Sequence, residues 1–519
     1  MSNRFSDILF QLIHSLKKAE KRHFKLYIKR SSGNEDLKII QLFDALDKIE
    51  EYDEKLLLKK LKNIEKPQLA NLKAHLYKQI LASLRLLKIS ENIDIQLNEQ
   101  LDYARILYNK GLKIQALKIT EKAKETARAN HKFSFLIQVI ALEKKIETLH
   151  ITRSSFETTS NLADEAIMVS NKISRVAKLS NLALLLYNWY VRNGHARNKE
   201  DEKSINEFFK HKLADVNDIE NDFYEKLYLY QSYVWYAFIK QDFLMYYKYS
   251  QKWVDLFDAE PFMIGVEIGH YIKGMHNLVT AHFDLRNIKK FESTLQKFEA
   301  FANTDLVLQH DNFLIHTFIY IHYAKVNEFL MKGNFADAVK IVPHLNSKLS
   351  EYAMFIDRHR VLVFNYKIAT LYFGNGDYDT CIDYLQHIIN ETINLKNDLQ
   401  CFARLMHLMC HYELGNMEIM DSLLKSVQRF MSKMQNVTVL EEEMFKFIRK
   451  IIKLNKTQAQ QEFKNFLHTI KQYESSSHET RAFAYLDVIS WVESKVNNTT
   501  MSSIIQAKFK ALQKKKPLR

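Results

Sequence analysis

Residues 332–338 read KGNFADA, and the same pattern returns as KGLKIQA at 110–116 and as NGDYDTC at 375–381. Each stretch has a glycine, an apolar residue shortly after it, and a small residue five positions after the glycine. Glycine readily adopts the left-handed conformation that ends a helix. The two residues that follow can then start a second helix that faces the same core. The pattern therefore predicts a helix, a tight turn and another helix.

The amino-acid composition extends this prediction to the whole chain. Only 10 of the 519 residues are Gly and 4 are Pro, whereas average usage would give about 35 and about 25. Sheet proteins need these residues in their many turns, and helix interiors exclude them. Since no useful stretch alternates between apolar and polar residues, the composition predicts an all-α fold of long helices joined by short turns.

Hydropathy and cysteine usage limit the class of protein. A hydrophobic content of 47% excludes a disordered chain. No apolar run approaches the roughly 18 residues that span a bilayer. The first 13 residues make a poor signal peptide, and three cysteines cannot form a disulfide framework. We therefore expect a cytoplasmic protein without a membrane span.

The turn pattern recurs along most of the chain. Gly194 and Gly415 mark two further turns, and degenerate copies without glycine occur at 154, 241, 286 and 455. The nine predicted turns, at 111, 154, 194, 241, 286, 333, 376, 415 and 455, lie 39 to 47 residues apart. Two helices of about 17 residues with two short connections have this length. Because one hairpin cannot bury its own apolar face, neighbouring hairpins should stack into a superhelix.

The hairpin pattern resembles the tetratricopeptide repeat family, which places small, aromatic and glycine residues at set spacings across a helical hairpin. The matching residues are Ala104, Leu107, Gly111, Ala116 and Ala123; Phe329, Gly333, Phe335 and Ala338; and Ala369, Tyr372, Gly376, Tyr378 and Cys381. The period is longer than the family's 34 residues, and the closing proline is absent. HEAT-like repeats, which share the period but not the glycine turn, are the second choice. The resemblance implies an α-α superhelix, that is, a tetratricopeptide-like solenoid of antiparallel helical hairpins.

The charge distribution separates the ends of the chain from its middle. The net charge is +14, of which residues 1–90 carry +8 and residues 508–519 carry +6, so the middle is neutral. We therefore expect a basic helical N-terminal region at 1–90. The repeat array should occupy 91–475, and a C-terminal capping helix with a basic tail should occupy 476–519.

The resemblance also implies a concave groove, lined by positions three, six, ten and thirteen residues before each turn. Large aromatic and amide side chains at these positions suit the binding of a peptide or protein. The predicted groove residues are Asn188, Tyr228, Gln231, Trp235, His276, Thr280, Tyr320, Tyr323, Asn327, Tyr366 and Thr370. The alternative, which is the commoner case for a single residue, is that aromatic side chains at helical spacing pack between helices.

A cationic stripe near the N-terminus offers a second surface. On a helix from Ser15 to Arg30, its members fall within an arc of about 140°: Lys17, Lys18, Lys21, Arg22, Lys25 and Lys29. Such a stripe can bind a phosphate backbone or an acidic protein, although a solvated face is the commoner meaning. A further helix should begin near Pro67 and reach about Leu87. Three helices in the first 90 residues could form a helix-turn-helix unit, but no residue set marks one. We expect the tail at 513–517 to be disordered and able to reinforce an anionic contact.

Catalytic motifs are missing from the sequence. No phosphate-binding loop, nucleophile elbow or metalloprotease helix occurs. His407, Cys410 and His411 could share a metal ion, but their helix must also pack inside the array, so we interpret them as structural. We therefore expect no enzyme activity, cofactor or metal. The predicted function is a cytoplasmic scaffold or adaptor that binds a protein or peptide; the alternative is a nucleic-acid-associated regulator that uses the basic ends. The oligomeric state stays open.

Overall fold

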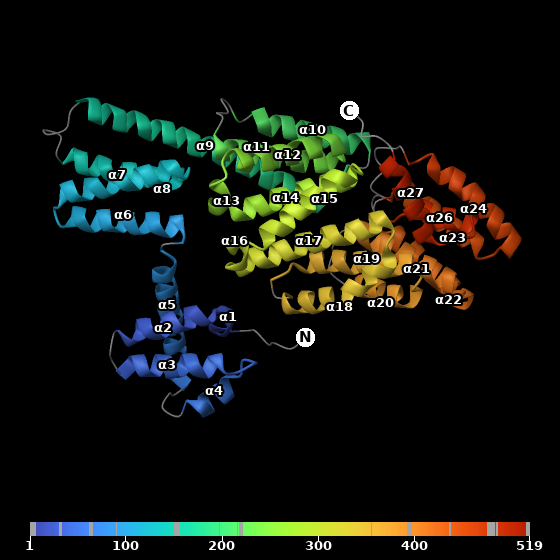
Figure 1. The fold of residues 1–519 in the computed structure, drawn as a ribbon, viewed down its shortest axis with the longest axis horizontal. Helices are drawn as coiled ribbons and strands as arrows, with labels where there is room; N and C mark the ends of the chain where they lie inside the picture. Colours follow the sequence, from blue (N-terminus) through green and yellow to red (C-terminus); the bar gives the residue numbers. More distant parts are fainter. Residues whose placement is uncertain are drawn as a thin grey trace. The chain divides into compact units, whose positions relative to one another are not determined.

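The computed structural model describes the chain with short gaps, and every element it describes is a helix (Figure 1). The described residues are 7–30, 34–61, 66–89, 91–149, 156–196, 198–214, 216, 222–353, 355–391, 397–434, 437–474, 483 and 486–514. The all-α prediction is confirmed for these ranges. The chain divides into two compact units, unit 1 at residues 1–172 and unit 2 at 173–519. The boundaries predicted after residues 90 and 475 stay predictions.

Two separate hydrophobic cores lie among the described residues of unit 1. Its helices are α1 (Ile8–Ser15), α2 (Lys18–Lys29), α3 (Asn34–Asp47), α4 (Glu54–Lys60), α5 (Lys66–Lys88), α6 (Ile93–Asn109), α7 (Lys113–Ala129), α8 (Phe133–Thr148) and the first part of α9 (Phe156–Asn193). Helices α1 to α5 enclose Phe10, Phe24 and Phe43. Helices α6 to α8 share a smaller core around Ala116 and Val139. The predicted helix that starts near Pro67 is present as α5.

The predicted helix from Ser15 to Arg30 is wrong in its first part, because Leu16 and Lys17 are not helical and interrupt it. The Glu20 carboxylate accepts a hydrogen bond from the Lys17 backbone N–H (2.9 Å), which caps the new helix at Lys18. Phe24 and Ile28 are the buried residues of α2, and the Phe24 ring packs 4.8 Å from that of Phe43. The buried side is therefore set by packing against α3 and α5.

Unit 2 is a succession of helices, most of which pack against the next one or the next but one along the chain. After α9 these are α10 (Lys199–Ala214), α11 (Phe223–Lys240), α12 (Phe243–Ala259), α13 (Met263–Val266), α14 (Ile268–Asp284), α15 (Ile288–Ala302), α16 (Asp305–Leu308), α17 (Asp311–Lys332), α18 (Phe335–Glu351), α19 (Arg358–Asn375), α20 (Tyr378–Ile389), α21 (Asn397–Leu414), α22 (Met417–Met431), α23 (Val439–Ile451), α24 (Lys456–Lys471), α26 (Val488–Val496) and α27 (Met501–Lys514). The first helices of successive hairpins also touch, α14 with α17, α17 with α19 and α19 with α21. They form a continuous row within the unit.

The turns between paired helices have the predicted conformation at most positions. All five turn glycines, at 111, 194, 333, 376 and 415, have positive φ, between 70° and 83°. Gln241 and Arg286 adopt the same left-handed conformation without glycine. The turn predicted at 154 lies outside the described residues. Asn455 instead caps α24 from an extended backbone, so that turn is of a different kind.

Helix α9 differs from the predicted hairpin, which would have two shorter helices. It runs unbroken for 38 residues, where the spacing of the turns predicts two helices and a connection. No Gly or Pro occurs between Phe156 and Asn193, so nothing in this stretch ends the helix. The boundary between the two units falls inside α9.

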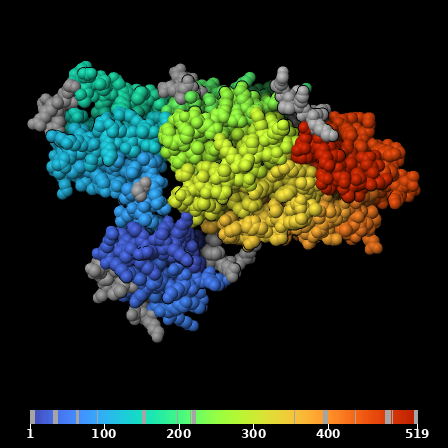
Figure 2. Space-filling model, in the orientation of Figure 1, coloured from blue at the N-terminus to red at the C-terminus, as the bar shows by residue number. Residues whose placement is uncertain are grey.

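The C-terminal helix returns to the middle of unit 2. The Ser502 hydroxyl donates to the Gly333 carbonyl oxygen (2.7 Å), and Ile505 is buried in the core that contains α17. A Cβ added at Gly333 would lie 3.0 Å from the Ser502 carbonyl oxygen, so glycine also permits this close approach. Helix α27 contacts α17 and α19, and Figure 2 shows the red C-terminal residues beside yellow ones. The helix therefore packs against two hairpins, and it contacts the first of them at its turn. The residues after Lys514 lie outside the described ranges.

Candidate functional site

The predicted groove residues of α9 and α11 form the first part of the row of first helices. The Trp235 ring packs 5.0 Å from Tyr187 and 5.6 Å from Tyr190, both on α9. Asn188, which follows Tyr187 on α9, is exposed. Because Trp235 is only half-buried, its outer edge and Asn188 offer an aromatic and amide surface.

Helices α11 and α14 are joined by polar side chains. The Gln231 amide donates to His270 Nδ1 (2.9 Å), and the Tyr228 ring meets the His270 ring edge-on at 5.7 Å. The Tyr224 hydroxyl donates to Glu267 (2.5 Å). These contacts place Gln231 and Tyr228, two predicted groove residues, directly against the start of α14.

A stack of rings continues the row across α14 and α17. The His276 ring lies parallel to that of Tyr320, with centroids 4.0 Å apart, and Tyr323 meets His276 edge-on at 6.0 Å. His316, one turn before Tyr320, approaches the Tyr320 ring at 6.3 Å. The structure therefore brings three predicted groove residues together, His276, Tyr320 and Tyr323.

Helix α19 adds cations to this stack. Arg360 Nη2 donates to the Tyr320 hydroxyl (3.1 Å), and its guanidinium lies 5.1 Å from the Tyr320 ring centroid. Lys367 Nζ lies 4.8 Å from the Tyr323 ring centroid. Cations prefer such positions over the faces of aromatic rings. We call Lys273, His276, His316, Tyr320 and Arg360 the cation–aromatic cluster.

The charges of this cluster lack an acidic partner. Among the described residues, no carboxylate forms an ion pair with Lys273 or Arg360, and Arg360 Nη1 is buried without a hydrogen bond. Partial desolvation of its ammonium group and the charge of Arg360 lower the pKa of Lys273. The same two causes lower the pKa of His276 to about 3 and also lower that of His316. At neutral pH the positive charge of the cluster therefore resides on Lys273 and Arg360.

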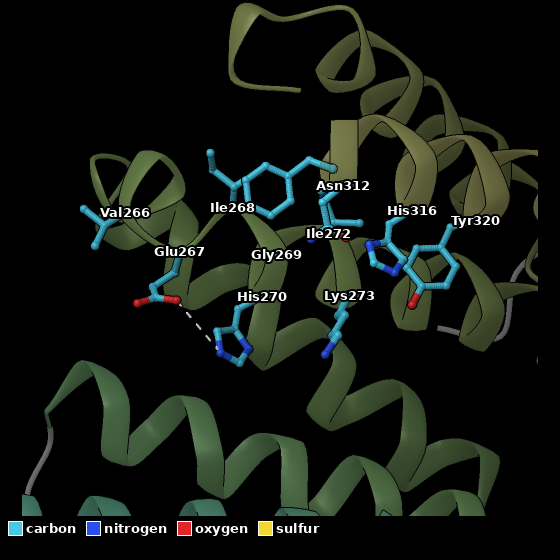
Figure 3. A pocket seen from close by; sticks show the side chains of 11 residues that line it. Val266, Glu267, Ile268, Gly269, His270, Ile272, Lys273, Asn312, His316 and Tyr320 are labelled. Carbon is cyan, nitrogen blue, oxygen red and sulfur yellow. Dashed lines mark ion pairs between the residues drawn. The ribbon is translucent and has the colours of Figure 1, made fainter. Parts of the chain in front are cut away.

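A pocket of about 320 Å³ opens beside the cluster, at the start of α14 and α17. In Figure 3 the His270 ring, the Lys273 side chain and the Tyr320 hydroxyl point to the same side. Its wall consists of Val266, Glu267, Ile268, Gly269, His270, Ile272, Lys273, Asn312, Phe313, His316 and Tyr320. Glu267 is already engaged by Tyr224 and lies 3.9 Å from His270. The pocket thus has an acidic end at Glu267 and a basic end at Lys273.

The remaining predicted groove residues face inward or bond within their own helix. Asn327 and Tyr366 are 2% and 3% exposed. The hydroxyls of Thr280 and Thr370 donate to the carbonyls four residues earlier, of His276 and Tyr366 (2.9 Å each). Fewer of the predicted groove residues are therefore available to a ligand than the sequence predicts.

Two members of the N-terminal stripe are neutralised. Lys21 pairs with Asp47 (2.5 Å) and Lys25 with Asp44 (2.6 Å), both on α3. The other four members are exposed: Lys17, Lys18, Arg22 and Lys29. Five helices, rather than three, build this region.

The predicted structural histidines lie on α21. The His407 and His411 rings meet edge-on at 4.5 Å, and the Asn416 amide donates to His411 Nδ1 (3.1 Å) at the following turn. Cys410 is fully buried, with its sulfur 3.5 Å from that of Cys381. Within the described residues, no three His, Cys, Asp or Glu side chains are grouped as a metal site would require.

Sequence reasoning missed most of the charged residues of the site. Lys273 stands thirteen residues before the turn at Arg286, at one of the groove spacings, so the signal was present. His316 and Arg360 stand 17 and 16 residues before their turns, one helical turn beyond that spacing. Extending the row to the full length of α17 and α19 would have found both.

None of the described helices is both long and apolar enough to cross a membrane. Comparisons with family models, with curated proteins and with solved structures give no match to this chain.

Proposed function

We propose that the chain is a non-enzymatic cytoplasmic scaffold or adaptor, in which the hairpins of unit 2 form a tetratricopeptide-like superhelical array. The row of first helices, α11, α14, α17 and α19, would line its groove and bind a protein or peptide. One observation carries the proposal: half-buried aromatic and cationic side chains continue across all four helices. Such side chains supply large contact area with hydrogen-bonding capacity, as protein-binding surfaces do.

The test compares substitutions in the groove with one outside it. Trp235→Ala and Tyr323→Ala each remove a half-buried ring from the row, and Leu244→Ala removes an exposed apolar side chain from α12. Full-length proteins serve as bait in the native host, and captured partners are quantified by mass spectrometry. We expect a partner lost from both groove variants and retained by Leu244→Ala, with unchanged helicity by circular dichroism. Equal capture by all three variants would reject the proposal.

The second candidate is a nucleic-acid-associated regulator that uses the basic ends. The observation that favours it is the set of exposed cations on α2, of which Lys18, Arg22 and Lys29 form no ion pair within the described residues. Duplex and single-stranded probes are tested by fluorescence anisotropy at two salt concentrations. Binding should weaken with salt and with the triple change Lys18→Glu, Arg22→Glu and Lys29→Glu. Absence of binding at low salt would exclude this function.

A further inference from the structure

The basic end of the pocket has a charge that the protein itself does not balance. Lys273 and Tyr320 line the pocket together, and Arg360 donates to the Tyr320 hydroxyl through one nitrogen. Its other terminal nitrogen, Nη1, is buried and has no hydrogen bond. A buried donor without a partner is unfavourable, and Arg360 contacts Tyr320 of the pocket wall, so this arrangement points to a ligand.

We propose that the basic end of this pocket binds a phosphate monoester dianion, held by Lys273, Arg360 and Tyr320. The inference rests on the proposed function and names the chemistry of the groove's ligand. The phosphoryl group could belong to a phosphorylated side chain of a bound peptide or to a small phosphorylated metabolite, and the experiment below separates these two sources.

Charge matching favours a dianion over a single carboxylate. Lys273 and Arg360 carry two positive charges, whereas His276 and His316 stay neutral because their pKa values are lowered. A phosphate monoester carries between one and two negative charges at neutral pH and has three peripheral oxygens. A carboxylate would leave one of the two cations unbalanced.

The available donors also match the three oxygens. Lys273 Nζ has three donors and no ion pair, and the Tyr320 hydroxyl can donate while it accepts from Arg360. Arg360, whose Nη1 is buried without a hydrogen bond, adds its positive charge behind Tyr320. Arginine and lysine together are a common combination for phosphate recognition. Lys273 is exposed on α14, so it can turn toward a ligand without any change in the core.

The experiment measures binding of small probes to the full-length chain by calorimetry at matched ionic strength, since salt screens such contacts. The probes are inorganic phosphate, N-acetyl-phosphoserine amide and N-acetyl-glutamate amide. We expect both phosphate probes to bind and the glutamate probe to bind much more weakly. Lys273→Met and Arg360→Met should each weaken phosphate binding by about tenfold or more.

Matched variants keep the test falsifiable. Lys289→Met removes an exposed cation from α15 and should leave the affinity unchanged. If Arg360→Met fails to fold, Lys273→Met, which changes an exposed side chain, still decides the question. Absence of phosphate binding, equal binding of the glutamate probe, or an unchanged affinity in Lys273→Met would overturn the proposal.

The source of the phosphoryl group is read from pooled nine-residue peptides with a central phosphoserine. Tighter binding of the pool than of the capped phosphoserine supports a peptide ligand, and equal binding supports a small metabolite. Failure of this inference is distinct from failure of the proposed function. Partner capture that depends on Tyr323 without phosphate binding overturns only the inference, whereas phosphate binding without such capture overturns only the scaffold.

Discussion

Two lysines, one in each unit, show opposite treatments of a positive charge. Lys124 on α7 is 8% exposed, and its Nζ lies 2.8 Å from Glu143 and 3.9 Å from Glu165. Burial alone would lower the pKa of Lys124, but these carboxylates outweigh it and raise the pKa. Lys273 on α14 forms no ion pair with a carboxylate among the described residues, and partial desolvation and the charge of Arg360 lower its pKa. A charge that serves the fold is compensated within the fold, and we interpret the uncompensated charge as serving a ligand.

The largest expected effect is a loss of stability on replacing Lys124, the lysine that is paired with carboxylates. Lys124→Met would leave the Glu143 carboxylate buried without its partner, which costs about 3–5 kcal/mol. The free energy of unfolding of unit 1 is measured in urea, together with hydrogen exchange in α7 and α8.

A double variant provides the control for this prediction. Adding Glu143→Leu to Lys124→Met should recover most of the lost stability, because the orphaned charge is removed. A loss below about 1 kcal/mol in the single variant would break the comparison between the two lysines.

The second effect concerns the neutral histidine of the cation–aromatic cluster. The pKa of His276 is lowered to about 3 by burial and by Arg360, so between pH 6.5 and 3 the unfolded chain binds more protons than the folded one. Stability should therefore fall as pH falls through this window, by about 2 kcal/mol at pH 5 from this residue.

His276→Phe keeps the stack on Tyr320 and removes the titrating group. Unfolding in urea at pH 7 and pH 5 should show a smaller loss of stability in this variant than in the wild type. Equal losses in both proteins would mean that the pKa of His276 is not lowered in the folded state. His282 and His407, whose pKa values burial lowers to about 4, contribute to the pH dependence that remains.

A smaller change is expected for Arg360→Met. This variant loses the hydrogen bond to the Tyr320 hydroxyl, which is worth about 1 kcal/mol, but it also removes a cation that lacks an acidic partner. Thermal unfolding should place it slightly below the wild type. A loss as large as that of Lys124→Met would show that Arg360 belongs to the fold and would remove the distinction drawn above.

The smallest effect is expected for Lys273→Met. The side chain is exposed and unpaired, and its removal relieves repulsion from Arg360, so the free energy of unfolding should stay within about 0.5 kcal/mol of the wild type. Denaturant unfolding beside Lys289→Met checks this. Clear destabilisation by Lys273→Met alone would contradict its assignment to a binding surface.

Sequence patterns sufficed for the local features of the fold. The turns at Gly111, Gly333 and Gly376 follow from the special conformation of glycine, and those at Gln241 and Arg286 follow from their spacing. His131 and Asn498 adopt the same left-handed conformation but were not predicted, because neither residue stands in the spaced pattern.

The site depended on contacts that no local pattern contains. Arg360 belongs to the site because it bonds to Tyr320, which lies 40 residues away on another helix. Lys21 and Lys25 are not available cations of the predicted stripe, because they form ion pairs with Asp47 and Asp44 on α3. Whether a cation is compensated is a property of packing between helices, so sequence spacing finds the row but not its charge balance.

The central claim is that the row of first helices in unit 2 is the binding surface. It is tested most directly by replacing Tyr323 with the photo-crosslinking amino acid p-benzoylphenylalanine in the native host, with the same replacement at Leu244 on α12 as the reference. We expect irradiation to join a partner to position 323 and not to position 244, and the added change Lys273→Met to reduce that adduct. Identical adducts at both positions, or none at position 323, would contradict the account.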